Sequence, residues 1–253
     1  MMQRTIFASD LDNTLLFSKK HAMETDICVE FLEGKPQGYL TKETPQYLEQ
    51  IMRRALFIPV TSRSLEQYRR IQFPPACRPR YAVTTNGAIL LIDGEIDRQW
   101  YEDSLEAVSP WKEALEKALQ ALNACPQAKR YRMVDEMFVF AACEQPRDAL
   151  ALYDLLRNTT PLDIGVSGRK IYFFPPPINK GAVIPKLRKR FGADRIICAG
   201  DSSIDIPMLQ QADFSIVPDR DLMKGLSCPE KVVWETAGRF YDFVLKEVTR
   251  YVG

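Results

Sequence analysis

The stretch from Arg4 to Leu15, RTIFASDLDNTL, decides the fold. Its first part, Arg4 to Asp10, is a short apolar run rich in β-forming residues, and the LDNTL that follows has the Asp and Asn residues of a tight turn. These residues predict a strand that runs into a loop. Two carboxylates, Asp10 and Asp12, stand at the end of this strand, where α/β proteins commonly place their functional residues.

The segments after this loop alternate between helix and strand. We expect a helix over 44–54, a strand over 55–60, a helix over 65–71 that starts from the hydroxyls of TSRS at 61–64, and a strand over 81–85. This alternation predicts a parallel sheet, whose functional residues lie in loops beyond the carboxyl ends of the strands. Asp10, Thr61 and Asn86 occupy such positions.

The pattern changes after Gly87. Residues 89–92 and 95–101 flank an Asp93-Gly94 turn and predict an antiparallel hairpin. Beyond it we expect a helix over 111–125, a strand within 131–142, a helix over 147–157 and a strand over 169–174. These segments predict an inserted α+β unit over 88–177, closed by three prolines at 175–177, between two parts of one core at 1–87 and 178–253.

After the prolines the first pattern returns. We expect helices over 181–191, 207–212 and 237–252, and strands over 195–199 and 214–217. Two more polar clusters lie here, Asn179-Lys180-Gly181 at a helix start and Gly200 to Asp205 after a strand. Each cluster alone has an ordinary explanation as a helix cap or turn. Four such clusters at the places where a parallel sheet builds its site indicate one shared function.

Taken together, the clusters resemble the four ordered motifs of the haloacid dehalogenase superfamily. The matching residues are DLDNT at 10–14, Thr61, Lys180, and Gly200-Asp201 through Asp205. The insert between the second and third motifs is similar to the large C2-type cap of subfamily IIB, the Cof-like and sucrose-phosphatase-like branch. The resemblance implies an α/β fold with a Rossmann-like parallel-sheet core and an inserted α+β cap. It also implies a Mg²⁺-dependent phosphatase of a small phosphorylated metabolite, with a sugar phosphate favoured.

The resemblance also implies roles for individual residues. Asp10 is expected to attack phosphorus and form an aspartyl phosphate, while Asp12 protonates the leaving oxygen and then activates water. Two carboxylates that face a phosphate dianion need a cation to offset their charge, and Mg²⁺ prefers such oxygen ligands. The implied catalytic residues are Asp10, Asp12, Thr61 and Lys180, the implied metal ligands are Asp10, Asp12, Asp201 and Asp205, and the implied substrate-binding residues are Ser62, Arg63, Asn86 and Asn179.

Two positions depart from the family pattern. Asn13 replaces the commoner glycine after the second aspartate, a change also typical of the sucrose-phosphatase-like branch. Ile204 stands where many relatives have an asparagine, so the hydrogen bonding of Asp205 is left open, as is its role as a direct ligand or as an anchor behind the metal. In the insert, four cations could contact an anion, although each alone is more often a solvated surface charge: Arg130, Arg132, Arg169 and Lys170.

Composition limits the partners. The 34 basic and 33 acidic residues leave a net charge of +1, which gives no general attraction to nucleic acid or to an anionic membrane. The start has no secretory signal, and no apolar run reaches the roughly 18 residues that span a bilayer. We therefore expect a cytoplasmic protein, a monomer or small homo-oligomer, with a small-molecule partner. Because His21 is the single histidine, catalysis is expected to depend on carboxylates, lysine and a metal.

Three other functions compete with a phosphatase. A phosphomutase could use the same aspartyl phosphate, and release of free phosphate without an isomeric product would exclude it. A dehalogenase needs no magnesium and has no use for Asp12, Lys180 and Asp201. A silent binding module that keeps this fold usually lacks the nucleophile or the metal carboxylate, and both are present in this sequence.

Overall fold

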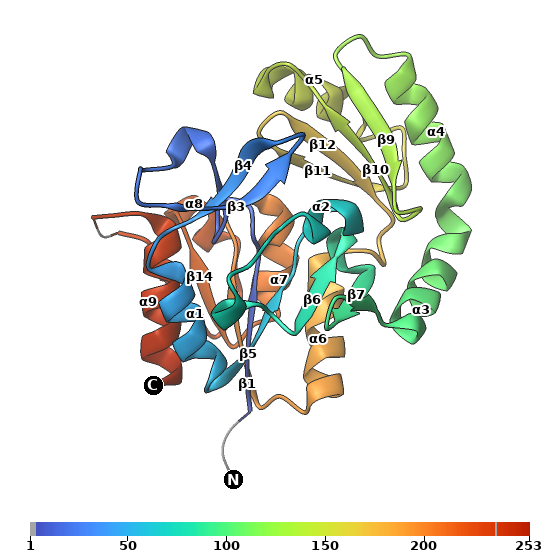
Figure 1. The fold of residues 1–253 in the computed structure, drawn as a ribbon. Coiled ribbons are helices and arrows are strands. Elements are labelled where there is room, and N and C mark those ends of the chain that lie inside the picture. Colours follow the sequence, from blue (N-terminus) through green and yellow to red (C-terminus); the bar gives the residue numbers. More distant parts are fainter. Residues whose placement is uncertain (1–3, 236) are drawn as a thin grey trace.

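A five-stranded parallel sheet forms the centre of the computed structural model, which describes residues 4–235 and 237–253 (Figure 1). Its strands, in spatial order, are β15 (Glu230–Val233), β14 (Phe214–Val217), β13 (Arg195–Ala199), β1 (Thr5–Ser9) and β5 (Ala55–Pro59). All residues of β1 and β14 are buried, as expected for strands covered on both faces. The predicted strands at 195–199 and 214–217 are confirmed with the same bounds, and those at 4–10 and 55–60 to within a residue or so.

Helices cover both faces of the parallel sheet. Alternate residues of β1 divide between two apolar clusters: Phe7 packs with the helices of one face, and Ile6 and Ala8 with those of the other. The first face carries α1 (Thr44–Met52) and α9 (Phe240–Val252), and the second carries α6 (Lys180–Phe191), α7 (Ile206–Gln210) and α8 (Arg220–Lys224). Helices α1, α6, α7 and α9 confirm the helices expected from the sequence, whereas α8 was not expected. None of the helices in the described ranges is long and apolar enough to cross a membrane.

A small antiparallel sheet, in the order β2-β4-β3, follows the first loop and was not expected from the sequence. It consists of β2 (Phe17–Ser18), β3 (Ile27–Leu32) and β4 (Lys35–Leu40). Glu33 and Gly34, both with positive φ, form the turn between β3 and β4. This hairpin lies at the carboxyl end of β1, on the side away from the N-terminus (Figure 1).

The predicted third strand of the parallel sheet belongs elsewhere. Residues 81–84 form β6 (Tyr81–Thr84), which pairs over its whole length with β7 (Ile89–Ile92) in an antiparallel sheet with β8 (Glu95–Ile96). A single bridge between Val60 and Val83 links β6 to the parallel sheet. The prediction failed because the Asn86-Gly87 turn lets the chain fold straight back, so that β7 takes the hydrogen bonds of β6.

The second strand of the predicted hairpin is shorter than expected. It ends at Ile96 instead of reaching Tyr101, because Asp97 caps a helix there: its Oδ1 accepts the Trp100 N–H at 2.9 Å. The helix is α3 (Arg98–Val108), and Trp100 packs into the apolar cluster of the parallel sheet. Part of the predicted insert is therefore packed against the core.

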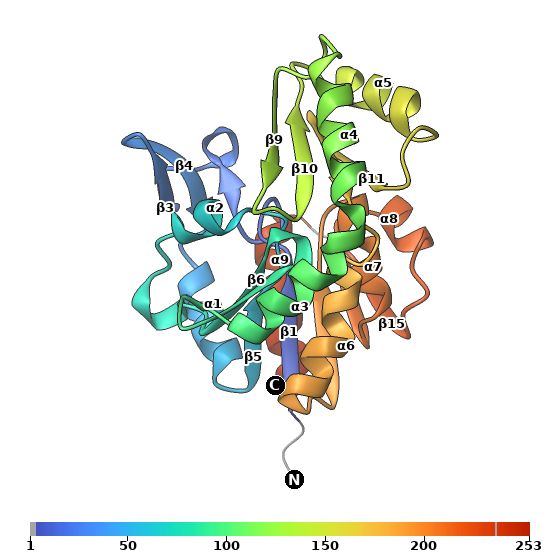
Figure 2. The same ribbon diagram turned by 90° about the vertical axis from the view of Figure 1, so that its right-hand side faces the viewer.

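A four-stranded antiparallel sheet, here called the cap sheet, lies within the predicted insert. Its strands, in spatial order, are β11 (Asp163–Ser167), β12 (Lys170–Phe174), β10 (Phe138–Ala142) and β9 (Arg130–Val134), and the helices α4 (Lys112–Asn123) and α5 (Pro146–Leu156) pack on it. The segment 131–142 thus holds two strands, separated by a turn with positive φ at Asp135 and Glu136. Figure 2 shows the cap sheet beyond the carboxyl end of β1.

The contacts between the cap sheet and the core include one at Asp135 and one at Ile204. In the β9–β10 turn, Asp135 Oδ2 accepts the Leu65 N–H at 2.9 Å and the Thr85 hydroxyl at 2.6 Å. Leu65 is the first residue of α2 (Leu65–Arg69), so Asp135 serves as an extra cap of this short helix. Near β11, Ile204 packs against the apolar cluster of the cap sheet. The remaining helical segments are 3₁₀ turns at Lys19–His21, Pro75–Cys77, Thr85–Gly87, Ser109–Trp111 and Ser203–Asp205.

Candidate active site

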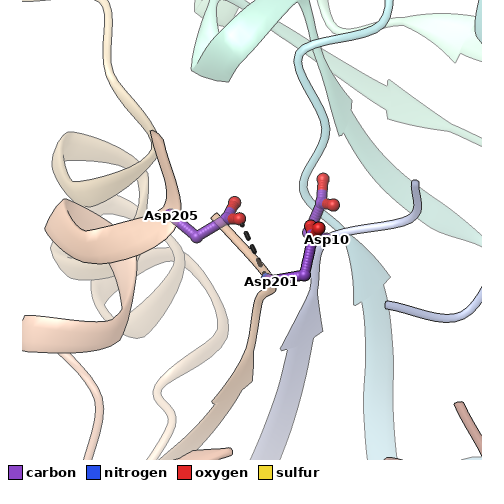
Figure 3. Close-up of side chains that lie close together, drawn as sticks. All are labelled: Asp10, Asp201 and Asp205. Atoms are coloured by element: carbon purple, nitrogen blue, oxygen red, sulfur yellow. Dashed lines mark hydrogen bonds between the residues drawn. The ribbon is translucent and has the colours of Figure 1, made fainter. Parts of the chain in front are cut away.

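Three carboxylates meet at the carboxyl edge of the parallel sheet. Strands β1 and β13 pair in parallel with Ser9 opposite Ala199, so Asp10 and Asp201 follow neighbouring strand ends. Each of Asp10, Asp201 and Asp205 offers a carboxylate oxygen within 4.8 Å of those of the other two (Figure 3). The sequence placed these residues far apart along the chain, and the structure brings them together.

Lys180 faces this cluster from the first turn of α6. Its Nζ donates to Asp10 Oδ1 and to Asp205 Oδ1, both at 2.6 Å, and the side chain is only 2% exposed. The predicted residue Asn179 caps the same helix, because its Oδ1 accepts the Ala182 N–H at 2.9 Å. Gly181 allows the close approach of α6 to the next loop, since a Cβ there would lie 2.5 Å from the Pro207 carbonyl oxygen.

Asp205 is held by four donors. Its Oδ2 accepts the N–H of Asp201 at 3.2 Å, the N–H of Ser202 at 3.0 Å and the hydroxyl of Ser202 at 2.9 Å, while Lys180 takes Oδ1. The loop folds this tightly because Gly200 has no side chain, and a Cβ there would lie 2.5 Å from that of Asp205. The backbone N–H groups of Asp201 and Ser202 and the Ser202 hydroxyl therefore supply the hydrogen bonding of Asp205 that the presence of Ile204 in place of an asparagine had left open. Because both carboxylate oxygens of Asp205 accept hydrogen bonds, the structure favours a role for Asp205 as an anchor of the loop over a role as a direct metal ligand.

The electrostatics of the cluster favour a cation. Burial raises the pKa of Asp10 to about 7 against the opposing charge of Lys180, and burial with the charges of Asp10 and Asp205 raises the pKa of Asp201 to about 8. Burial opposes the charged form of Lys180, but Asp10 and Asp205 outweigh it and its pKa lies above the usual value. One ammonium group does not balance three carboxylates, so the all-oxygen cluster fits a hard divalent ion.

Asp12 forms an ion pair with Arg63, a half-buried arginine. Arg63 Nε donates to Asp12 Oδ2 at 2.9 Å, Arg63 Nη2 to Asp12 Oδ1 at 2.7 Å, and Arg63 Nη1 to Glu30 Oε2 at 2.9 Å. Burial raises the pKa of Asp12, but the charge of Arg63 outweighs it and holds the pKa below the usual range. Glu30, on β3, is a site residue that the sequence analysis missed, and its side chain is 5% exposed.

The other predicted residues lie at different depths. Thr61 is fully buried, and its Oγ1 accepts the Arg63 N–H at 3.2 Å. Ser62 lines the cavity described below, as does Tyr172. Asn86 and Asn179 do not line that cavity. They border a neighbouring one of about 700 Å³, and Asn86 Nδ2 donates to the Ile178 carbonyl at 3.0 Å.

A cavity of about 1000 Å³ opens between these residues and the cap sheet. On the core side Asp10, Asp12, Lys180 and Asp201 line it, and His21 lies at its wall. The facing side carries the insert cations that the sequence left undecided between anion contact and solvated surface: Arg130, Arg132, Arg169 and Lys170. A second cavity of about 410 Å³, beside the β3–β4 hairpin, shares Asp12, Ser62 and three of these cations.

Comparison with known proteins identifies the fold. No family model and no curated protein match the sequence. Among solved structures, the chain is similar over its full length to the sucrose-phosphatase of Synechocystis sp. PCC6803, with 18% identity, a TM-score of 0.64 and 98% of that chain covered. A haloacid dehalogenase-like hydrolase from B. subtilis matches with 14% identity and a TM-score of 0.59, over 99% of both chains. Trehalose-6-phosphate phosphatase from Aspergillus fumigatus matches with 11% identity and a TM-score of 0.54, over 99% of this chain and 92% of that one.

Proposed function

This chain has the fold of the haloacid dehalogenase-like hydrolases, and from that premise we propose that it is a phosphatase of a small phosphorylated metabolite. The observation that carries the proposal is the contact of Lys180 with Asp10 beside two further carboxylates. A nucleophilic carboxylate, a fixed ammonium group and a site for a divalent cation are the groups that phosphoryl transfer requires. A sugar phosphate is favoured, because the similar structures include a sucrose-phosphatase and a trehalose-6-phosphate phosphatase.

Asp10 is proposed as the nucleophile. One of its oxygens is taken by Lys180, which leaves the other to attack phosphorus as the bond from phosphorus to the leaving oxygen breaks. The products of this step are an aspartyl phosphate and an alcohol. Water then attacks the phosphorus of that intermediate, which releases inorganic phosphate and restores the carboxylate of Asp10.

Asp12 is proposed to protonate the leaving oxygen and later to take the proton from the attacking water. In the structure its carboxylate is held by Arg63, whose charge favours the ionised form. To act as an acid, Asp12 must exchange this contact for one with the substrate. Arg63 is therefore proposed to position Asp12 between turnovers, with Glu30 holding the guanidinium from behind.

We propose Mg²⁺ as the cation, held by Asp10, Asp201 and the backbone carbonyl of Asp12, with Asp205 as the anchor of the loop. When bound, the ion would offset the negative charge that the carboxylates and the phosphate bring together. Lys180 would carry the remaining positive charge, and the Thr61 hydroxyl would hydrogen-bond the transferring phosphoryl group. Because Asp10, Lys180 and Asp205 are buried, their charges act with little screening by water.

The direct test is phosphate release by the purified full-length protein. With MgCl₂ present, we expect hydrolysis of p-nitrophenyl phosphate and of at least one member of a sugar phosphate panel, and loss of both activities when EDTA removes the metal. Free phosphate without an isomeric sugar phosphate excludes a phosphomutase. No release from any substrate on the panel would favour the silent binding module.

Magnesium binding is expected to stabilise the fold independently of turnover. At a Mg²⁺ concentration of 100 times its Kd, binding adds about 2.7 kcal/mol to the free energy of unfolding. For a chain of this size that raises Tm by roughly 5 °C or more, which differential scanning fluorimetry measures. Asp201→Asn should remove most of the shift, whereas Asp221→Asn, an exposed carboxylate of the same core, should keep it. An equal shift in both variants would contradict the assignment.

Arg63→Lys is expected to lower kcat about tenfold or more, since lysine keeps the charge but cannot contact both Asp12 and Glu30 with a planar fork. Because Asp12 acts in the chemical step, the loss should appear in kcat with a smaller change in KM. Steady-state kinetics with p-nitrophenyl phosphate measure both. Arg80→Lys, at an exposed ion pair with Asp93, provides the control. An unchanged kcat in Arg63→Lys would show that Asp12 does not depend on this arginine.

A further inference from the structure

One face of the cap sheet is turned toward the carboxylates of the core. Side chains alternate between the two faces of a sheet, and the strand register places residues in rows across β9, β10 and β12. Two rows line the large cavity, Arg132-Phe140-Tyr172 and Arg130-Ala142-Lys170. The next residue along β12, Phe173, points to the opposite face, where it borders a cavity beneath α4. The three cations in these rows therefore face the site instead of the helices.

The cavity-facing cations of the cap sheet have no acidic partner. In residues 4–235 and 237–253, none of the nitrogens of the following side chains lies within 4.0 Å of a carboxylate oxygen: Arg130, Arg132, Arg169 and Lys170. The cations on the core side of the two cavities are in contrast all paired, Arg63 and Arg70 with Glu30 and Lys180 with Asp10. Four positive charges thus face the cavity without an ion-pair partner.

A single phosphate group does not account for these four charges. The phosphoryl group binds at Asp10, where Lys180 and a divalent cation already offset its charge. The cap sheet lies on the other side of the cavity, where the leaving group of the substrate must sit. Lys170 lines both cavities together with Asp12, so the cap cations begin where the leaving oxygen would lie. A neutral leaving group would leave these four cations without an anionic partner.

The same face offers apolar surface between the cations. The rings of Phe140 and Tyr172 have centroids 5.4 Å apart and stand in one row with Arg132. An aromatic surface of this kind packs against the carbon skeleton of a small metabolite, while guanidinium and ammonium groups beside it bind an anion. This combination distinguishes a ligand site from a plain charged surface.

We propose that the leaving group of the substrate carries a second negative group, a carboxylate or a phosphate, bound by Arg132 and Lys170. Arg130 and Arg169 flank this subsite, and the carbon skeleton lies against Phe140 and Tyr172. The inference rests on the proposed phosphatase function and adds the substrate class to it: a small phosphate monoester with a second anionic group.

Three matched ligands test the inference: glucose 6-phosphate, 6-phosphogluconate and glucose 1,6-bisphosphate. They share a six-carbon skeleton and differ in having no second anion, a carboxylate or a second phosphate. We expect kcat/KM for at least one of the two ligands with a second anionic group to exceed that for glucose 6-phosphate by about tenfold or more, as charge-assisted hydrogen bonds would give. Whichever of the two gives the larger ratio identifies the second anion.

Arg132→Gln and Lys170→Gln should each bring this ratio down toward one. Arg147→Gln, at an exposed position of α5 away from both cavities, is the matched control and should keep the ratio of the native enzyme. Calorimetric titration of the three ligands into the Asp10→Asn protein measures the same preference without turnover.

The outcomes separate the two proposals. Absence of p-nitrophenyl phosphate hydrolysis by the native enzyme would sink the phosphatase, and the calorimetric preference would still decide the subsite. Hydrolysis with equal kcat/KM and equal binding for the three ligands would overturn the anionic subsite alone. A preference that survives in both Arg132→Gln and Lys170→Gln would overturn it as well.

Discussion

Asp10→Asn is expected to lower turnover on the order of 10⁴-fold or more, because the amide cannot attack phosphorus and removal of a nucleophile eliminates the main reaction path. Asparagine keeps the shape of the side chain and an oxygen that can still accept the Lys180 hydrogen bond. It also removes one of three crowded carboxylates, whose burial and mutual repulsion raise the pKa of Asp10 to about 7. The loss of activity should therefore come with little loss of stability.

Two measurements check this prediction on the same preparation. Phosphate release gives the activity, and urea denaturation followed by circular dichroism gives the free energy of unfolding. Asp221→Asn, on the exposed surface, controls for the general effect of removing a carboxylate. If the Asp10→Asn protein keeps more than a small fraction of native turnover, another group is the nucleophile. If it loses both activity and stability, Asp10 is a structural carboxylate.

Lys180→Met is expected to have the largest effect on stability. The ammonium group is fully enclosed and holds Asp10 and Asp205 at 2.6 Å, so its removal leaves both carboxylates buried without a positive partner. Breaking a buried ion pair in this way costs about 3–5 kcal/mol of unfolding free energy. The double contact therefore adds a structural cost to the loss of chemistry.

Urea denaturation measures this cost, with Lys189→Met as the control because Lys189 is an exposed residue of the same helix. The double variant Lys180→Met with Asp205→Asn should recover part of the stability, since it removes one of the uncompensated carboxylates. A single variant as stable as Lys189→Met would mean that the carboxylates are protonated or hydrated, and that Lys180 contributes no net stabilisation.

The parts of the fold that could be predicted are those whose signal is local. Strands β13 and β14 are largely buried on both faces, so each is a mostly apolar run with clear ends. The clusters at Asp10, Lys180 and Asp201 could be placed together because parallel strands end at one edge of a sheet. Their contacts in the structure agree with that reasoning.

The parts that could not be predicted depend on partners distant in the sequence. Glu30 lies in a strand of mixed polarity near the molecular surface, and its partner Arg63 is 33 residues away, so no periodicity marks the pair. Arg63 was expected to contact substrate, but its guanidinium is occupied by Asp12 and Glu30. In the cap sheet, the side of the cavity on which Arg130 and Arg132 fall follows from strand register, which turn geometry and burial determine together.

The contacts of Asp135 also affect how molecules enter and leave the large cavity. Its carboxylate accepts hydrogen bonds from Leu65 and Thr85, which hold the β9–β10 turn of the cap sheet to the core. Ile204 packs against the apolar cluster of the cap sheet near β11. Because both contacts hold the cap sheet against the core, molecules enter and leave either through the opening of the cavity or after the hydrogen bonds of Asp135 have broken. Weaker hydrogen bonds at Asp135 would shorten the time that each product stays in the cavity and would let more bulk solvent reach the reacting groups.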